Sequence, residues 1–128
     1  MIWKTTKGIT IQVVSQYAAE HSKPSYKKFV HGYHVNIIND SENTVQLLRR
    51  HWYIHDSDQT IREVEGSGVI GVQPVIRPGE NHTYQSWSAL HTAIGKMHGH
   101  YTMKDLATDQ EFKVEIPEFA LVADHKLN

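Results

Sequence analysis

The chain has 128 residues, of which 39% are hydrophobic and 21% are charged, a composition typical of one folded domain and not of a disordered chain. Lysine and arginine number 13 against 14 for aspartate and glutamate, so the chain lacks the positive excess that a DNA-binding or membrane-surface protein needs. The absence of cysteine excludes disulfides, thiolate metal ligands and a thiol nucleophile. No signal-peptide pattern and no apolar run of membrane-spanning length are present, so we expect a cytoplasmic protein with one domain over residues 1–128 and no DNA or membrane partner.

Hydrophobic and polar residues alternate along most of the chain, as expected for strands with one buried face. The alternating stretches are 9–13, 29–37, 48–54, 97–103 and 112–116. In the third of these, the pattern predicts that Leu48, Trp52 and Ile54 share one face, with Arg50 between them.

Turn-forming residues separate these stretches, at 39–43, 55–60, 77–81 and 106–110. The segment YAAEHSKPSY, residues 17–26, is the one helix candidate, but Pro24 interrupts it, so we expect a loop or a short turn. Short strands joined by frequent turns predict an antiparallel β-sandwich of about seven or eight strands.

The segment EGSGVIGVQP holds Gly66, Gly68 and Gly71 in the G-x-G-x-x-G spacing of dinucleotide-binding turns. That function requires a helix directly after the glycines, with its N-terminus directed at the phosphates. Pro74 and Pro78 follow instead, and they would break such a helix. The sequence therefore excludes a Rossmann-type site.

Two interpretations of this glycine segment remain. The favoured one is structural: the glycines allow positive φ angles or close backbone packing where two strands meet. The alternative is a helix-free anion site, in which backbone N–H groups of Gly66, Ser67, Gly68 and Gly71 surround a phosphate. Arg62 and Arg77 flank the segment and would then supply charge-assisted hydrogen bonds.

Ten histidines are an unusually high number for this length. His98 and His100 would lie on one face of a strand, where they could share a transition-metal ion, but a closed site needs about four ligands. His31 and His34 should point to opposite faces, which excludes them as a pair. Solvated surface histidines are therefore the favoured interpretation, His98 and His100 are kept as a weak metal candidate, and no cofactor is expected.

Catalytic patterns are scarce. Ser67 does not lie in a nucleophile elbow, and the sequence places no base beside Ser86 or Ser88. No pair of carboxylates stands out for acid–base catalysis. We therefore expect a binding module and not an enzyme, with Trp52 in the core and Trp87 as the aromatic residue that contacts a partner.

Four segments together resemble the bacterial ApaG family: VQLLRRHWYI, EVEGSGVIGVQPVIRPGENHTYQS, GKMHGHYTM and FKVEIPEFAL. The resemblance runs from about residue 11 to about residue 121, and its long G-x-G-V-x-G-x-Q-P-x-I-x-P-G-E core is far more specific than three glycines. It implies an immunoglobulin-like or fibronectin type III-like β-sandwich.

The resemblance also carries functional expectations. It implies no enzymatic activity, a genetic link to magnesium and cobalt efflux, and a gene near one for a diadenosine-tetraphosphate hydrolase. The same domain in F-box proteins and in a DNA polymerase delta-interacting protein implies an unidentified protein partner. A pyrophosphate or nucleotide-polyphosphate site is implied at Gly66, Gly68 and Gly71. The sequence leaves monomer and homodimer open.

Overall fold

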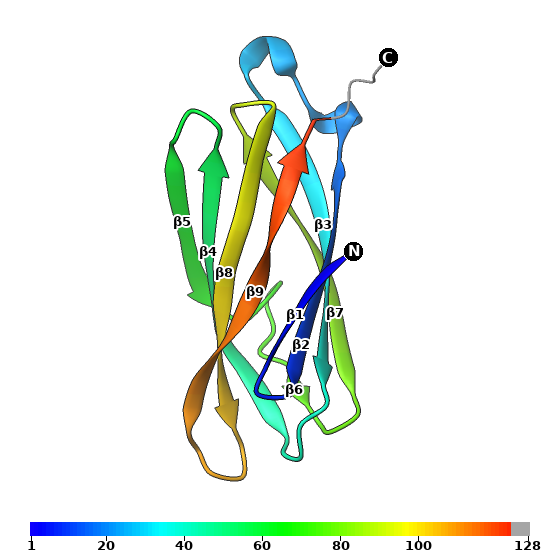
Figure 1. The fold of residues 1–128 in the computed structure, drawn as a ribbon, viewed down its shortest axis with the longest axis vertical. Coiled ribbons are helices and arrows are strands. Elements are labelled where there is room, and N and C mark those ends of the chain that lie inside the picture. The colour runs from blue at the N-terminus through cyan, green and yellow to red at the C-terminus, as the bar shows by residue number, and fades with distance from the viewer. Residues whose placement is uncertain (124–128) are drawn as a thin grey trace.

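The computed structural model describes residues 1–123 as two antiparallel β-sheets packed face to face (Figure 1). One sheet has the order β1-β2-β3-β7, and the other has the order β5-β4-β8-β9 with β6 paired to β4. The strands are β1 (Ile2–Thr6), β2 (Ile9–Tyr17), β3 (Phe29–Asn39), β4 (Val45–Asp56), β5 (Ile61–Ser67), β6 (Val75–Ile76), β7 (Asn81–Leu90), β8 (Ile94–Asp105) and β9 (Glu111–Val122). The predicted antiparallel sandwich is confirmed.

The described residues form nine strands, more than the seven or eight predicted, and β6 contributes only two residues. The segment 17–26 forms two short 3₁₀ turns, η1 (Ala19–His21) and η2 (Pro24–Tyr26), as the proline in it predicts. Among residues 1–123, no helix is long and apolar enough to cross a membrane.

The hydrophobic core lies between the sheets, and the inward residues of the alternating stretches fill it. Its fully buried side chains include Ile9, Ile11, Val13, Val35, Ile37, Leu47, Met97, Tyr101, Met103, Val114 and Leu121. Trp52 lies at its centre, with edge-to-face contacts to Tyr101 and Phe119 at ring-centroid distances of 6.5 and 6.0 Å. The predicted core position of Trp52 is confirmed.

The alternation in β4 changes phase at a β-bulge. The register with β8 pairs Leu47 with Met103 and Arg49 with Thr102, which leaves Leu48 as an extra residue. Before the bulge, Leu47 is buried, and after it Trp52 and Ile54 are buried. The prediction that Leu48 shares their inward face is therefore wrong, because a uniform period of two cannot represent an inserted residue.

Candidate functional site

The glycine segment forms a tight hairpin that interrupts the edge of the second sheet. β5 pairs with β4 up to Ser67, the chain turns, and β6 returns to pair with the same side of β4. The N–H groups of Val69 and Val72 each donate to the other's carbonyl oxygen, at 2.8 and 3.2 Å. Between them, Ile70 and Gly71 have φ angles of 46° and 77°, the signs of a type I′ turn. This turn buries Val69 completely in the core.

The glycines have separate structural roles in this hairpin. Gly68 has a φ of +62°, and a Cβ there would lie 2.1 Å from the carbonyl oxygen of Val72. A Cβ on Gly66 would lie 2.7 Å from the guanidinium of Arg50, so Gly66 leaves room for that group. Gly71 supplies the positive φ that the turn needs. These contacts support the structural interpretation of the spacing.

Several backbone N–H groups that an anion-binding concavity would need already donate to carbonyl oxygens within the protein. Gly68 donates its N–H to the Leu48 carbonyl at 2.8 Å, and the N–H groups of Val69 and Val72 are bonded as described above. Arg50 Nη1 donates to the carbonyl oxygens of Ser67 and Gly68, at 3.0 and 3.1 Å. The segment thus directs carbonyl oxygens at a cation of the protein itself.

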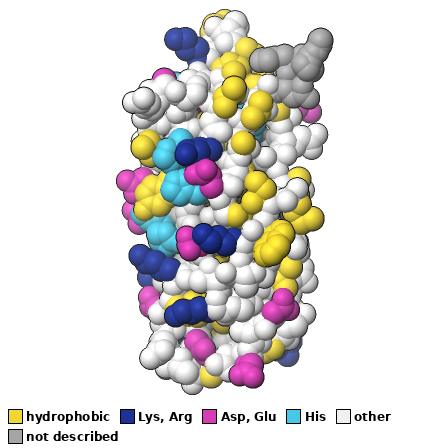
Figure 2. Space-filling model, viewed as in Figure 1, with side chains coloured by type: hydrophobic (Ala, Val, Ile, Leu, Met, Phe, Trp, Pro, Cys, Tyr) yellow, Lys and Arg dark blue, Asp and Glu magenta, His cyan; other side chains and the backbone are white. Residues whose placement is uncertain are grey.

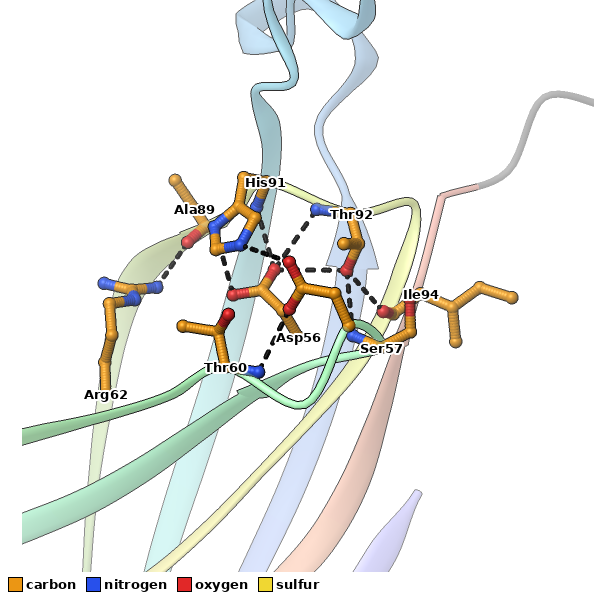
Figure 3. Close-up of polar contacts among 9 residues, drawn as sticks. Asp56, Ser57, Thr60, Arg62, Ala89, His91, Thr92 and Ile94 are labelled. Atoms are coloured by element: carbon orange, nitrogen blue, oxygen red, sulfur yellow. Dashed lines mark hydrogen bonds and ion pairs between the residues drawn. The ribbon is translucent and has the colours of Figure 1, made fainter.

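The two arginines that flank the segment do not converge on it. Arg62 lies four residues before Gly66 on β5, about 13 Å away at strand spacing. It donates to the carbonyl of Ala89 on β7 and so links the two sheets (Figure 3). Arg77 lies beyond β6, where its Nε is 3.5 Å from Glu80 Oε2. The structure therefore places Arg62 and Arg77 away from the glycine segment that they were predicted to assist.

A different basic surface adjoins the glycine hairpin. Gly66 and Ser67 line one side of an open depression of about 620 Å³ on the outer face of the second sheet. Arg49 of β4, His100 of β8 and Lys113 of β9 line it as well. The strand register brings these residues together from three strands, so the sequence spacing alone did not reveal them.

The same outer face carries a continuous row of rings along β4 and β8. Figure 2 shows the histidine side chains gathered on this face, with charged side chains beside them. The ring centroids follow in the order His100, His51, Tyr53, His98 and His55, at successive distances of 5.0, 4.6, 5.1 and 5.0 Å. Cross-strand pairing of His51 with His100 and of Tyr53 with His98 sets this order.

His98 and His100 do share a strand face, but each contacts a histidine of β4. His98 Nε2 lies 2.9 Å from His55 Nε2, while the His100 ring lies beside His51. Burial, and then the neighbouring His55, lower the pKa of His98 below its usual value of 6.5. Burial, followed by the positive charge of Lys113, lowers the pKa of His100. The sequence pattern did not reveal that His55 and His51 are the cross-strand neighbours of these two histidines.

A second hollow, of about 250 Å³, lies on the outer face of the first sheet. Trp87 of β7 forms one wall and is 60% exposed. It lies across from Gly32 of β3, and a Cβ on Gly32 would be 3.2 Å from the indole ring. His21 of η1 contacts the indole edge-on at a centroid distance of 5.6 Å. Trp87 is therefore held in place and exposed.

A polar cluster joins the β4–β5 and β7–β8 connections (Figure 3). The side chain of Asp56 is fully buried, and its Oδ1 accepts from the N–H groups of His91 and Thr92 at 2.8 and 3.2 Å. The ring of His91 lies between two carboxylates, with Nδ1 3.3 Å from Asp56 Oδ2 and Nε2 3.0 Å from Asp58 Oδ2. These bonds fix two loops to each other, so we assign the cluster a structural role.

Comparison with known proteins agrees with this architecture. The family model described as the ApaG domain matches residues 19–105. Protein ApaG of Rhodospirillum centenum is 42% identical over 125 residues, covering 98% of this chain and 95% of that protein. Protein ApaG of Vibrio cholerae is 45% identical over 120 residues, covering 94% of each.

The fold has counterparts among solved structures. The crystal structure of a Bordetella pertussis protein named ApaA superposes with a TM-score of 0.87 at 35% identity, over 97% of both chains. A second X-ray structure, of a structural genomics target, superposes with a TM-score of 0.86 at 33% identity. The chain belongs to the ApaG family.

Proposed function

We propose that this ApaG-family chain is a non-catalytic binding module that recognises a protein partner through the hollow beside Trp87. The observation that carries the proposal is an exposed tryptophan fixed against a glycine on an otherwise mostly polar sheet face. Tryptophan is enriched among the few residues that provide most of the binding energy of protein interfaces.

The residues that line the hollow indicate which kind of peptide segment would bind there. Val14, which is 50% exposed, Tyr17 and Ala18 add apolar surface beside Trp87. Glu20 is the one lining residue with a fixed charge. An extended segment with an apolar anchor residue and a nearby lysine or arginine fits this lining.

The hydroxyl groups of residues 1–123 are not arranged as activated nucleophiles. Within this range, no serine or threonine hydroxyl is hydrogen-bonded to a histidine ring, the arrangement that activates such nucleophiles. His91 is held by two aspartates, but the neighbouring Thr92 hydroxyl lies against Asp56 Oδ1 and Ile94 O and not against the imidazole. We therefore expect no hydrolase activity that uses a serine or threonine nucleophile.

A random peptide library displayed on phage tests the proposed surface directly. Peptides selected on the intact protein should share an apolar anchor and should lose most of their affinity for Trp87→Ala. Trp3→Ala is the matched control, because Trp3 is 64% exposed but is not among the residues that line the hollow. Selected peptides that bind Trp87→Ala and the intact protein equally would contradict the proposal.

The family's implied link to magnesium and cobalt efflux suggests a cellular setting for the partner. We propose that the partner belongs to divalent-cation homeostasis. In a strain that lacks its own ApaG-family gene, the intact chain and Trp3→Ala should restore cobalt tolerance, and Trp87→Ala should not. Full restoration of cobalt tolerance by Trp87→Ala would show that the hollow is not required for this role.

The depression beside Gly66 favours a second candidate function, binding of pyrophosphate or a nucleotide polyphosphate. Arg49 and Lys113 face it, although Arg49 Nη2 also lies 3.1 Å from Glu111 Oε1. Titration of ¹⁵N-labelled protein with pyrophosphate should shift the amide resonances around Ser67 and His100. Lys113→Ala should weaken these shifts, and Arg62→Ala, whose side chain lies elsewhere, should not. No saturable shift at millimolar ligand would exclude this site.

A further inference from the structure

His55 and His98 bring two imidazole nitrogens together at one end of the row of rings. Their Nε2 atoms are 2.9 Å apart, and the two ring planes are inclined by 29°. This separation is shorter than the roughly 3.5 Å contact of rings that lie face to face. The rings are therefore stacked with an offset, their centroids 5.0 Å apart, and the offset brings the two Nε2 atoms to hydrogen-bonding distance.

We propose that His55 and His98 form a chelating site for a divalent transition-metal ion. Two nitrogens 2.9 Å apart subtend about 90° at an ion that is about 2.05 Å from each, the usual metal–imidazole distance. An angle of 90° is that of neighbouring ligands in square-planar and octahedral sites, which Cu²⁺ and Ni²⁺ favour, and it is smaller than the angle of tetrahedral Zn²⁺ sites. The site thus selects Cu²⁺ or Ni²⁺, with water completing the coordination.

Ring stacking holds His98 in place, and His55 in turn contacts His98. Tyr53 stacks on His98 at a centroid distance of 5.1 Å with planes 16° apart, and its other neighbour is His51, at 4.6 Å and 22°. Each ring comes from the middle or end of a long strand and not from a loop. Little side-chain freedom remains to be lost when an ion binds, which favours affinity.

The proton between the two rings does not prevent binding. In the free protein, one Nε2 donates a hydrogen to the other, so one neutral ring carries its proton on Nε2. When that proton moves to Nδ1 of the same ring, both Nε2 lone pairs become available to one ion without a change in net charge. Binding should therefore weaken only when the imidazoles become protonated.

The surrounding charges are balanced. Lys96 lies opposite His55 in the strand register, but its Nζ is 3.2 Å from Glu118 Oε1. Glu118 therefore offsets the positive charge that would otherwise repel an ion.

A neighbouring group of possible ligands is less suited to one ion. His51, Glu63 and Glu65 lie close together, but Glu63 is 2.8 Å from His51 Nε2 and Glu65 is 3.3 Å from His51 Nδ1. The two carboxylates therefore face opposite nitrogens of the ring. One ion bound to a single nitrogen of His51 cannot use both of them in these positions.

Calorimetric titration of the full chain with NiCl₂ and with CuSO₄ tests the site. We expect one ion per chain, and each of His55→Ala and His98→Ala should weaken binding at least about tenfold. His100→Ala and His34→Ala are matched controls, since each removes a strand histidine outside the pair, and both should bind like the intact chain. Equal loss in His98→Ala and His100→Ala, or no loss in His55→Ala, would overturn the proposal.

Paramagnetic broadening provides a second measurement that does not depend on how the variants fold. Substoichiometric Cu²⁺ should broaden the imidazole resonances of His55 and His98 first in the intact protein. Broadening centred on His51 or His100 would overturn the proposal.

His55→Phe keeps a ring against His98 but offers no ligand, so it should remain folded by circular dichroism and lose the ion. Retention of the ion by this variant would also overturn the assignment.

Discussion

The guanidinium of Arg50 occupies the space beside Gly66 that a Cβ at that position would enter, with only 2.7 Å between them. This close approach accounts for a glycine at the first position of the motif. It also implies that the two residues are energetically coupled across β4 and β5.

Gly66→Ala should displace Arg50 and weaken its bonds to the carbonyls of Ser67 and Gly68. Hydrogen bonds from charged groups contribute about 1.5–3 kcal/mol, but Arg50 is flexible and can shift, so we expect a loss of about 1–2 kcal/mol. Urea unfolding of Gly66→Ala, Arg50→Ala and the double variant would measure the coupling. Strictly additive losses would show that the two residues do not interact.

Gly68→Ala should be more destabilising than Gly66→Ala. Its Cβ would meet the backbone oxygen of Val72 at 2.1 Å, and backbone cannot move aside as a side chain does. Its φ of +62° adds strain. We expect a loss of at least about 2 kcal/mol in the free energy of unfolding. A loss smaller than that of Gly66→Ala would contradict the hairpin geometry.

Ile70→Asn should stabilise the protein. Ile70 is a β-branched residue with a φ of 46° and is 62% exposed, so it carries left-handed strain with little burial to offset it. Asparagine tolerates this conformation, and we expect a gain of about 1 kcal/mol in the free energy of unfolding. Thermal and urea unfolding measure it, and a loss of stability would show that the Ile70 side chain makes a compensating contact.

Asp56→Ala should destabilise strongly, because the N–H groups of His91 and Thr92 lose their buried acceptor. We expect a loss of about 3 kcal/mol in the free energy of unfolding. The exposed neighbour Asp58 also contacts His91, and Asp58→Ala should lower the melting temperature far less. Similar melting temperatures for the two variants would contradict the structural role of Asp56.

Acidification should destabilise the protein through His31. Burial lowers the pKa of His31 below 6.5, and Nε2 of this ring has no hydrogen-bond partner among residues 1–123. The unfolded chain therefore takes up a proton at higher pH than the folded chain, so the free energy of unfolding falls as pH drops below about 6.5. Above that pH, this contribution is constant.

His31→Leu should reduce the slope of melting temperature against pH between about pH 7 and pH 5. His34→Ala, on the exposed face of the same strand, is the control and should leave the slope unchanged. Part of the slope will persist in His31→Leu, because the pKa values of His98 and His100 are lowered as well. An unchanged slope in His31→Leu would show that His31 does not determine the acid response.

The sequence predicted the sandwich because a period of two is local and is read directly from residues such as Ile9, Ile11 and Val13. It also excluded the nucleotide-binding helix, because Pro74 is a local signal. The phase change at Leu48 was missed because a bulge is defined by pairing with another strand, and one strand's pattern does not contain that information.

The candidate sites were predicted less well, for the same reason. His98 and His100 were identified as outward residues of one strand, which the structure confirms. Their actual neighbours, His55 and His51, are more than 40 positions away and are set by the register of β4 against β8. Arg62 and Arg77 were chosen for proximity in sequence, whereas Lys113 reaches the depression from β9.

The bulge at Leu48 also determines which residues between Arg49 and Asp56 face the core and which face water. If Leu48 were paired as an ordinary strand residue, the alternation would continue unbroken from Leu47, so that His51, Tyr53 and His55 would face the core and Trp52 and Ile54 would face water. The row of imidazoles on the surface therefore depends on how Leu48 is paired as much as on the histidines themselves. Deletion of Leu48 would instead leave a regular strand that keeps the present inner and outer faces.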